Sequence, residues 1–211
     1  MGKQPKIYYR LKEDVGLNEE RVATFETLAD EAGLTREQRD CIVKHGFLVA
    51  PSSFRHHSNY AGGLVDHSAN VVRRLKELLE LYFKGEEDKK WLSEHFNPAK
   101  VGLLHDYCKA LYSEKILGNG EWTYKQLPLQ GHAEVSLMAL QSIGITFTPY
   151  ELLAVRWHMG AYGLDADALN AYDVAIENSK NLVIFTHHAD MVASRIDERE
   201  HAYTTRKEWV D

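Results

Sequence analysis

Six residues of metal-binding types lie on, or at the ends of, segments with the apolar periodicity of α-helices. Imidazole nitrogens and carboxylate oxygens are ligands for divalent cations. A histidine or aspartate on a buried helix face is costly unless it is paired or bound to a cation. One such residue is usually a satisfied core side chain, but six spread over five helices predict a metal centre. The six are His67, His105, Asp106, His132, His158 and Asp190.

Two of these ligand types, His105 and Asp106, are adjacent near the end of the segment 101–109. Apolar residues recur in this segment at helical spacing, so one face of the helix is expected in the core. Pro98 suits the first turn of this helix, and Asn97 suits the cap before it. Neighbours on a helix point about 100° apart, so both side chains can reach one point only if it lies beside the helix. A metal ion fits that geometry.

The other four ligand types belong to four further predicted helices. Each of these segments has an apolar stripe that would face a common core. His67 lies near the start of a helix from about 64 to 83, His132 opens one that runs to about 142, His158 ends one from 149 to about 159, and Asp190 lies within one from about 181 to 199.

The remaining pattern predicts an all-α bundle with one small β-hairpin. Asn18 and Thr35 are expected to cap two N-terminal helices within 18–46. Gly118-Asn-Gly120, between two short β-prone runs, predicts the hairpin. The other segments are a charged loop over 84–90, a short helix over 91–96 and a weak helix or loop over 165–178. The chain, 1–211, is expected to form one domain with its core at about 54–199 and the helices of 18–46 packed on it.

Composition sets limits on the class of protein. The chain has 211 residues, 44% of them hydrophobic and 27% charged, which is ordinary for a globular protein. Its net charge of −6 argues against broad binding to nucleic acid. A nucleotide substrate remains compatible, because bound cations would reverse the local charge. Two cysteines make no disulfide framework, and no apolar run could span a bilayer. We therefore expect a cytoplasmic protein that does not insert in membranes.

The order of these residues resembles the HD superfamily of metal-dependent phosphohydrolases, in particular the HD domains of bacterial 3′→5′ exoribonucleases and related stand-alone hydrolases. The family pattern is a histidine, a His-Asp doublet and a distant aspartate, all on helices. Here these are His67 in Gly-Gly-Leu-Val-Asp-His-Ser, His105-Asp106 in Leu-Leu-His-Asp-Tyr-Cys-Lys, and Asp190 in Thr-His-His-Ala-Asp. The resemblance covers about residues 54–199 and implies an HD-type helical bundle.

The resemblance also implies roles for single residues. His67, His105, Asp106 and Asp190 would hold a first metal ion, and Asp106 would bridge to a second ion. Members with two ions carry two further histidines, and here His132 and His158 hold those positions. The ions could be Mn, Fe, Co, Ni, Zn or Mg. Asp106 and Lys109 would be the catalytic residues, with Lys109 also contacting phosphate.

Other side chains near these motifs have two interpretations each. His57 and Arg156 could bind phosphate, or could be a polar loop histidine and a solvated helix arginine. His187 lies one turn before Asp190 and could face the site. Asp66 and Glu134 could orient a ligand histidine or protonate a leaving group.

The expected function is hydrolysis of a phosphoester in a nucleotide or short oligonucleotide by a metal-bound hydroxide. An alternative is a mononuclear 5′-nucleotidase or dNTP hydrolase, which would need only His67, His105, Asp106 and Asp190. A further alternative, from another class, is a metal- or nucleotide-binding regulatory module without turnover. No other cofactor is expected.

Overall fold

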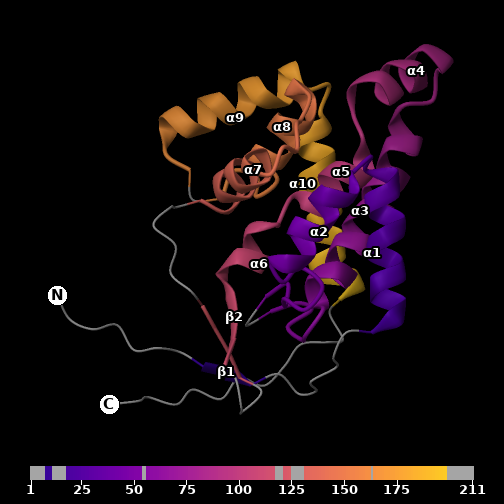
Figure 1. The fold of residues 1–211 in the computed structure, drawn as a ribbon. Helices are drawn as coiled ribbons and strands as arrows, with labels where there is room; N and C mark the ends of the chain where they lie inside the picture. Colours follow the sequence, from indigo (N-terminus) through magenta and orange to yellow (C-terminus); the bar gives the residue numbers. More distant parts are fainter. Residues whose placement is uncertain are drawn as a thin grey trace.

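The computed structural model describes residues 8–10, 18–53, 56–116, 121–124, 131–162 and 164–198. This part of the chain is mostly helical, as the all-α prediction required (Figure 1). None of its helices combines the length and apolarity needed to cross a membrane. The helices are α1 (Glu19–Glu31), α2 (Arg36–Lys44), α3 (Gly63–Tyr82), α4 (Glu86–His95), α5 (Pro98–Leu104), α6 (Cys108–Tyr112), α7 (His132–Ser142), α8 (Pro149–Arg156), α9 (Ala166–Asn178), α10 (Leu182–Val192) and the π-helical turn η1 (Ala193–Asp197).

Local capping chemistry explains where several helices begin. The Asn18 side chain accepts a hydrogen bond from the backbone of Glu20 at the start of α1. Thr35 and Gln38 form a reciprocal capping box at the start of α2. Asn97 caps α5, whose first residue is Pro98. The predicted starts at Asn18, Thr35 and Asn97 are therefore confirmed.

The long helix α3 is the centre of the bundle, with α5 on one side and α10 on another (Figure 1). Its buried residues Val71, Leu75 and Leu79 belong to an apolar cluster with Leu182 and Phe185 of α10. A second cluster joins α3 to α1 and α5. The helices α7 and α8 pack on each other, and α8 also contacts α5 and α10. These contacts bring α3, α5, α8 and α10 around one point.

Two segments differ from expectation. The charged stretch expected as a loop over 84–90 is helical from Glu86, because Gly85 serves as its N-cap and acidic residues fill the first turn, where the helix dipole favours them. The weak segment over 165–178 is the regular helix α9, with Asp165 as its cap.

Three short strands lie at the end of the bundle where α6 finishes (Figure 1). They are β1 (Tyr8–Arg10), β2 (Ser113–Ile116) and β3 (Glu121–Tyr124), and β3 pairs antiparallel with both others in the order β1-β3-β2. The predicted hairpin turn, 117–120, lies outside the described residues, so the hairpin as a whole stays a prediction.

Candidate metal centre

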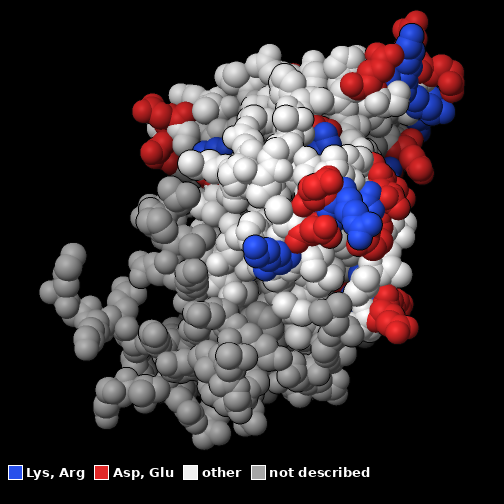
Figure 2. Space-filling view, in the orientation of Figure 1, with Lys and Arg blue, Asp and Glu red and all other residues white. Residues whose placement is uncertain are grey.

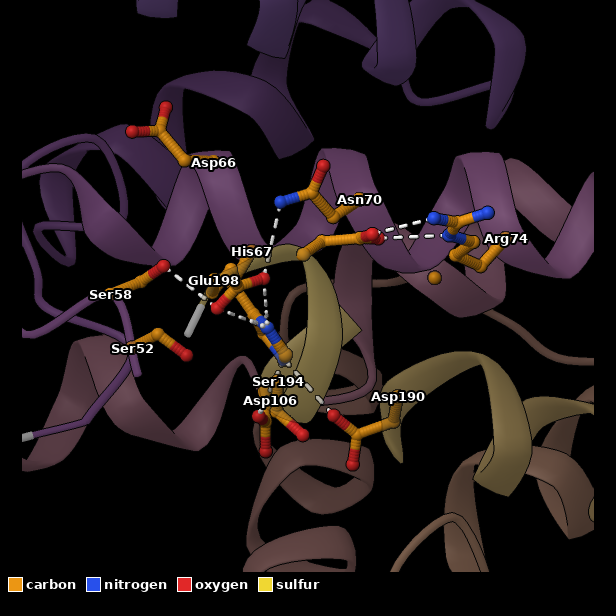
Figure 3. Close-up of polar contacts among 12 residues, drawn as sticks. Ser52, Ser58, Asp66, His67, Asn70, Arg74, Asp106, Asp190, Ser194 and Glu198 are labelled. Carbon is orange, nitrogen blue, oxygen red and sulfur yellow. Dashed lines mark hydrogen bonds and ion pairs between the residues drawn. The ribbon is translucent and has the colours of Figure 1, made fainter. Parts of the chain in front are cut away.

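Five of the six ligand types predicted from the sequence lie close together inside the bundle. His67 comes from the second turn of α3, Asp190 from α10, and His158 from the turn after α8. His105 and Asp106 occupy the turn between α5 and α6. Figure 3 shows the side chains of His67, Asp106 and Asp190 pointing toward one another.

The atoms that could bind a cation are a few ångströms apart. Nε2 of His67 lies 3.3 Å from an oxygen of Asp190 and 3.6 Å from Oδ2 of Asp106. Nε2 of His105 lies 3.3 Å from the same Asp106 oxygen, while Nε2 of His158 lies 3.5 Å from Oδ1. The two oxygens of Asp106 therefore face different histidines.

Two overlapping groups of side chains could each hold a metal ion. One consists of His67, His105 and Asp190, and the other of His105, Asp106 and His158; within each group the ligand atoms lie within 4.8 Å of one another. The three histidines are fully buried, and Asp106 is only 3% exposed. Buried groups of this chemistry need a positive partner, and a divalent ion would supply one.

The histidine rings are oriented as metal ligands usually are. Nδ1 of His105 donates to the backbone oxygen of Gly102 at 2.8 Å, and Nδ1 of His158 donates to that of Val155 at 2.7 Å. Nδ1 of His67 lies 3.0 Å from a carboxylate oxygen, which can only accept. The three Nε2 atoms are buried and make no hydrogen bond within the described part of the chain. Each ring thus keeps a free nitrogen for a cation while its other nitrogen is fixed.

The charges around Asp106 and Asp190 keep both carboxyl groups ionised. Burial alone would raise the pKa of the Asp106 carboxyl, but the nearby charges of Lys109 and His105 hold it well below its usual range. Burial acts likewise on Asp190, and the adjacent His67 lowers the pKa of that carboxyl below its ordinary value. Burial would lower the pKa of His67, but both aspartates raise it well above its usual value. Both carboxylates are therefore ionised at neutral pH and attract positive charge.

One side of the centre is lined by groups that suit an anion. Lys109 contacts Asp106, and its ammonium also lies 3.4 Å from the hydroxyl of Ser52. The His57 ring lies 4.7 Å from the ring of His67. Burial, with the charges of His67 and Lys109, lowers the pKa of His57 to about 3, so this ring is neutral. Lys109 and His57, two of the predicted phosphate contacts, therefore lie beside the ligand groups, and Ser52 lies next to Lys109.

His132 is the one predicted ligand that belongs to none of these groups in the described part of the chain. It is the first residue of α7 and is exposed, with Nδ1 3.5 Å from the sulfur of Cys108. Its role as a ligand stays a prediction.

Arg156, a predicted phosphate contact, forms an ion pair with Glu134 at 2.7 Å and stacks over Trp157. The described contacts of this arginine are therefore with its neighbours and not with the ligand groups.

Of two other candidate residues, His187 supports the centre and Asp66 does not. Nδ1 of His187 donates to the backbone oxygen of His158 at 2.7 Å. Its ring packs against Gly160, where an added Cβ would lie only 2.7 Å from the ring. His187 therefore holds the turn that carries His158. The expectation that Asp66 orients a ligand histidine is wrong, because its carboxylate accepts hydrogen bonds from Arg21 and Tyr60 and points away from His67 (Figure 3).

Sequence reasoning missed Glu198, the carboxylate that binds Nδ1 of His67. A regular helix would turn it about 80° away from Asp190. The π-helical turn η1 changes this direction, since the backbone N–H of Glu198 bonds to the oxygen of Ala193, five residues earlier. The only signal in the sequence was an acidic residue two turns after Asp190.

Comparison with protein-family models, with curated proteins and with solved structures finds no match. The resemblance to HD phosphohydrolases therefore rests on the sequence pattern alone.

Proposed function

We propose that this protein is an HD-type phosphohydrolase that uses divalent metal ions. The observation that carries the proposal is the convergence of three buried Nε2 atoms, from His67, His105 and His158, on two ionised aspartates. A structural core histidine would instead have both nitrogens satisfied. His67, His105, Asp106 and Asp190 would hold one ion, and Asp106 with His158 and the predicted ligand His132 would hold a second.

The chemistry of these ligands suits phosphoester hydrolysis. A bound divalent cation would lower the pKa of water and neutralise charge that develops on phosphoryl oxygens. Asp106 would orient both halves of the centre, because its two oxygens face different histidines. Lys109 would bind a non-reacting phosphoryl oxygen as a compact positive charge, and Ser52 and His57 would complete the anion-binding side.

The surface favours a small substrate over broad binding to nucleic acid. On the face shown in Figure 2, positive side chains lie beside acidic ones and form no continuous positive area. Arg39 pairs with Glu26, and Lys76 pairs with Glu31. A nucleotide or short oligonucleotide would be recognised by its phosphate at the centre, without a positive track for a long chain.

A direct test is phosphate or alcohol release by protein loaded with Mn²⁺ or Co²⁺. The substrates are p-nitrophenyl phosphate, bis-p-nitrophenyl phosphate, deoxynucleoside monophosphates and deoxynucleoside triphosphates. Asp106→Asn should abolish turnover while keeping the fold. Asp66→Asn is the matched control, because Asp66 is a carboxylate next to His67 that binds Arg21 instead. Equal activity in the wild-type and Asp106→Asn proteins would overturn the proposal.

The position of His132 favours one second candidate, a mononuclear nucleotidase. His132 is exposed and lies outside the ligand groups, so a second ion would have one histidine fewer than a binuclear centre expects. In that case His132→Ala would leave the activity intact, and deoxynucleoside monophosphates or triphosphates would be the better substrates. A binuclear diesterase would lose most of its activity in the same variant.

A further inference from the structure

Glu198 carries a buried carboxylate and is 3% exposed. Its described hydrogen-bond partners come from α3 and from the loop before it. Its Oε2 accepts a hydrogen bond from the hydroxyl of Ser58 at 2.7 Å. Its Oε1 accepts one from the side-chain amide of Asn70 at 3.2 Å. Nδ1 of His67 lies 3.0 Å from Oε1 and 3.3 Å from Oε2 (Figure 3).

The neighbouring residue, Asp197, fixes the segment that carries Glu198. Its carboxylate accepts hydrogen bonds from Arg73 at 2.7 Å and from Arg74 at 2.9 Å, both on α3. The end of η1 is therefore attached to α3 twice, near the surface through Asp197 and in the core through Glu198. The i→i+5 bond of the π-helical turn is what lets the two adjacent acids reach the same helix.

We propose that Glu198 is a positioning residue that prepares His67 to bind a cation. Nδ1 of His67 donates its hydrogen to the Glu198 carboxylate, so a cation that replaces the proton on the other ring nitrogen would bind the lone pair of Nε2. Nε2 is the atom that faces Asp190 and Asp106. The inference deepens the proposed function and rests on it, since it assigns a role toward the same metal centre.

A different role for Glu198, as a ligand itself, fits the contacts less well. His57, His67 and Glu198 also form a group whose atoms lie within 4.8 Å. However, both oxygens of Glu198 already accept hydrogen bonds, from Ser58, Asn70 and His67. A cation bound there would have to displace the hydrogen on Nδ1 of His67. The carboxylate is therefore assigned to orienting the ring.

The test is a titration of the metal-free full-length protein with Co²⁺, followed by the visible d–d absorption of the bound ion and by calorimetry. Loss of a carboxylate that orients a ligand histidine lowers metal affinity by about 10- to 100-fold. We expect about 100-fold for Glu198→Ala and about tenfold for Glu198→Gln, which keeps the shape and one acceptor oxygen.

The matched control is Glu151→Gln. Glu151 is also a buried carboxylate, 1% exposed, and it accepts hydrogen bonds from Asn97, Lys100 and Thr148 away from the centre. This variant should lose stability but bind Co²⁺ within about twofold of the wild-type affinity, because distant sites act independently. If Glu198→Ala does not fold, Asn70→Ala removes one hydrogen bond to Glu198 from a half-buried position of α3 and should weaken Co²⁺ binding by about fivefold.

Three outcomes are distinct. Weaker Co²⁺ binding in the Glu198 and Asn70 variants than in Glu151→Gln supports the proposal. Tight binding by the wild type with unchanged affinity in the Glu198 variants overturns the positioning role and leaves the metal centre intact. A wild-type protein that binds no Co²⁺ overturns the proposed function, and the positioning role with it.

Discussion

The spacing of the candidate metal centre depends on a close approach between α3 and α5 at Gly102. A Cβ added to Gly102 would lie 2.6 Å from a methyl of Val72, 2.9 Å from its backbone nitrogen and 3.0 Å from its Cα. Ordinary contacts begin at 3.4 Å. The methyl could rotate away, but the backbone atoms could not, so Gly102→Ala should push the helices apart by about 0.5 Å. α3 carries His67, and α5 leads into His105.

This displacement should affect both stability and metal binding. Overpacking costs about 1–3 kcal/mol, and the better helix propensity of alanine offsets up to about 1 kcal/mol. The expected net loss of about 1–2 kcal/mol lowers the melting temperature by about 2–8 °C at this chain length. Metal ligands must be held within about 0.5 Å of their productive positions. The expected displacement reaches that limit, so Co²⁺ affinity should fall by about tenfold. The shift also moves the Gly102 oxygen that accepts from His105.

Thermal unfolding by circular dichroism and Co²⁺ titration measure the two effects. Gly85→Ala is the control, since Gly85 is exposed, has an ordinary φ of −72° and meets only the end of the Asp88 side chain. It should change the stability by less than about 0.5 kcal/mol. A Gly102→Ala protein that is as stable as the wild type and binds Co²⁺ equally would refute the claim that this contact sets the spacing.

Three further predictions concern single residues near the centre. Lys109→Met should bind Co²⁺ at least as tightly as the wild type, because a positive charge beside Asp106 is removed. Its kcat/KM for a phosphoester should fall by at least about tenfold, and an unchanged kcat/KM would count against the phosphate contact. Burial raises the pKa of the Cys108 thiol to about 12, and only a thiolate reacts with iodoacetamide. At pH 8 the reagent should therefore modify only Cys41 in the folded protein, and detection of alkylated Cys108 by mass spectrometry would contradict this. Arg21→Met removes three hydrogen bonds to the partly exposed Asp66 and should lower the free energy of unfolding by about 1–2 kcal/mol, measured by urea denaturation, while Co²⁺ affinity stays unchanged.

The helices and most of the candidate site could be predicted because their signals are local. Capping side chains at Asn18, Thr35 and Asn97 locate helix starts, and apolar stripes show which face is buried. Histidines on such stripes are conspicuous because burial without a partner is costly. The burial of His67 and His158 therefore follows from the sequence pattern alone.

Other features could not be read from the sequence because they depend on packing. Glu198 reaches His67 only through a π-helical turn, which breaks the 3.6-residue periodicity used to assign faces. Asp66 is adjacent to His67 in the sequence, but the position of Arg21 on α1 determines its partner. The exposure of His132 depends on how α7 packs, and the sequence pattern of α7 does not specify it.

The most direct test of the central claim is the number of metal ions bound per chain. Protein would be loaded with Co²⁺, dialysed and measured by inductively coupled plasma mass spectrometry, together with Asp106→Asn and the control Asp66→Asn. We predict about two ions per chain in the wild type and in the control, and loss of both in Asp106→Asn, whose oxygens face both halves of the centre. A folded wild-type protein that retains no metal would contradict the account.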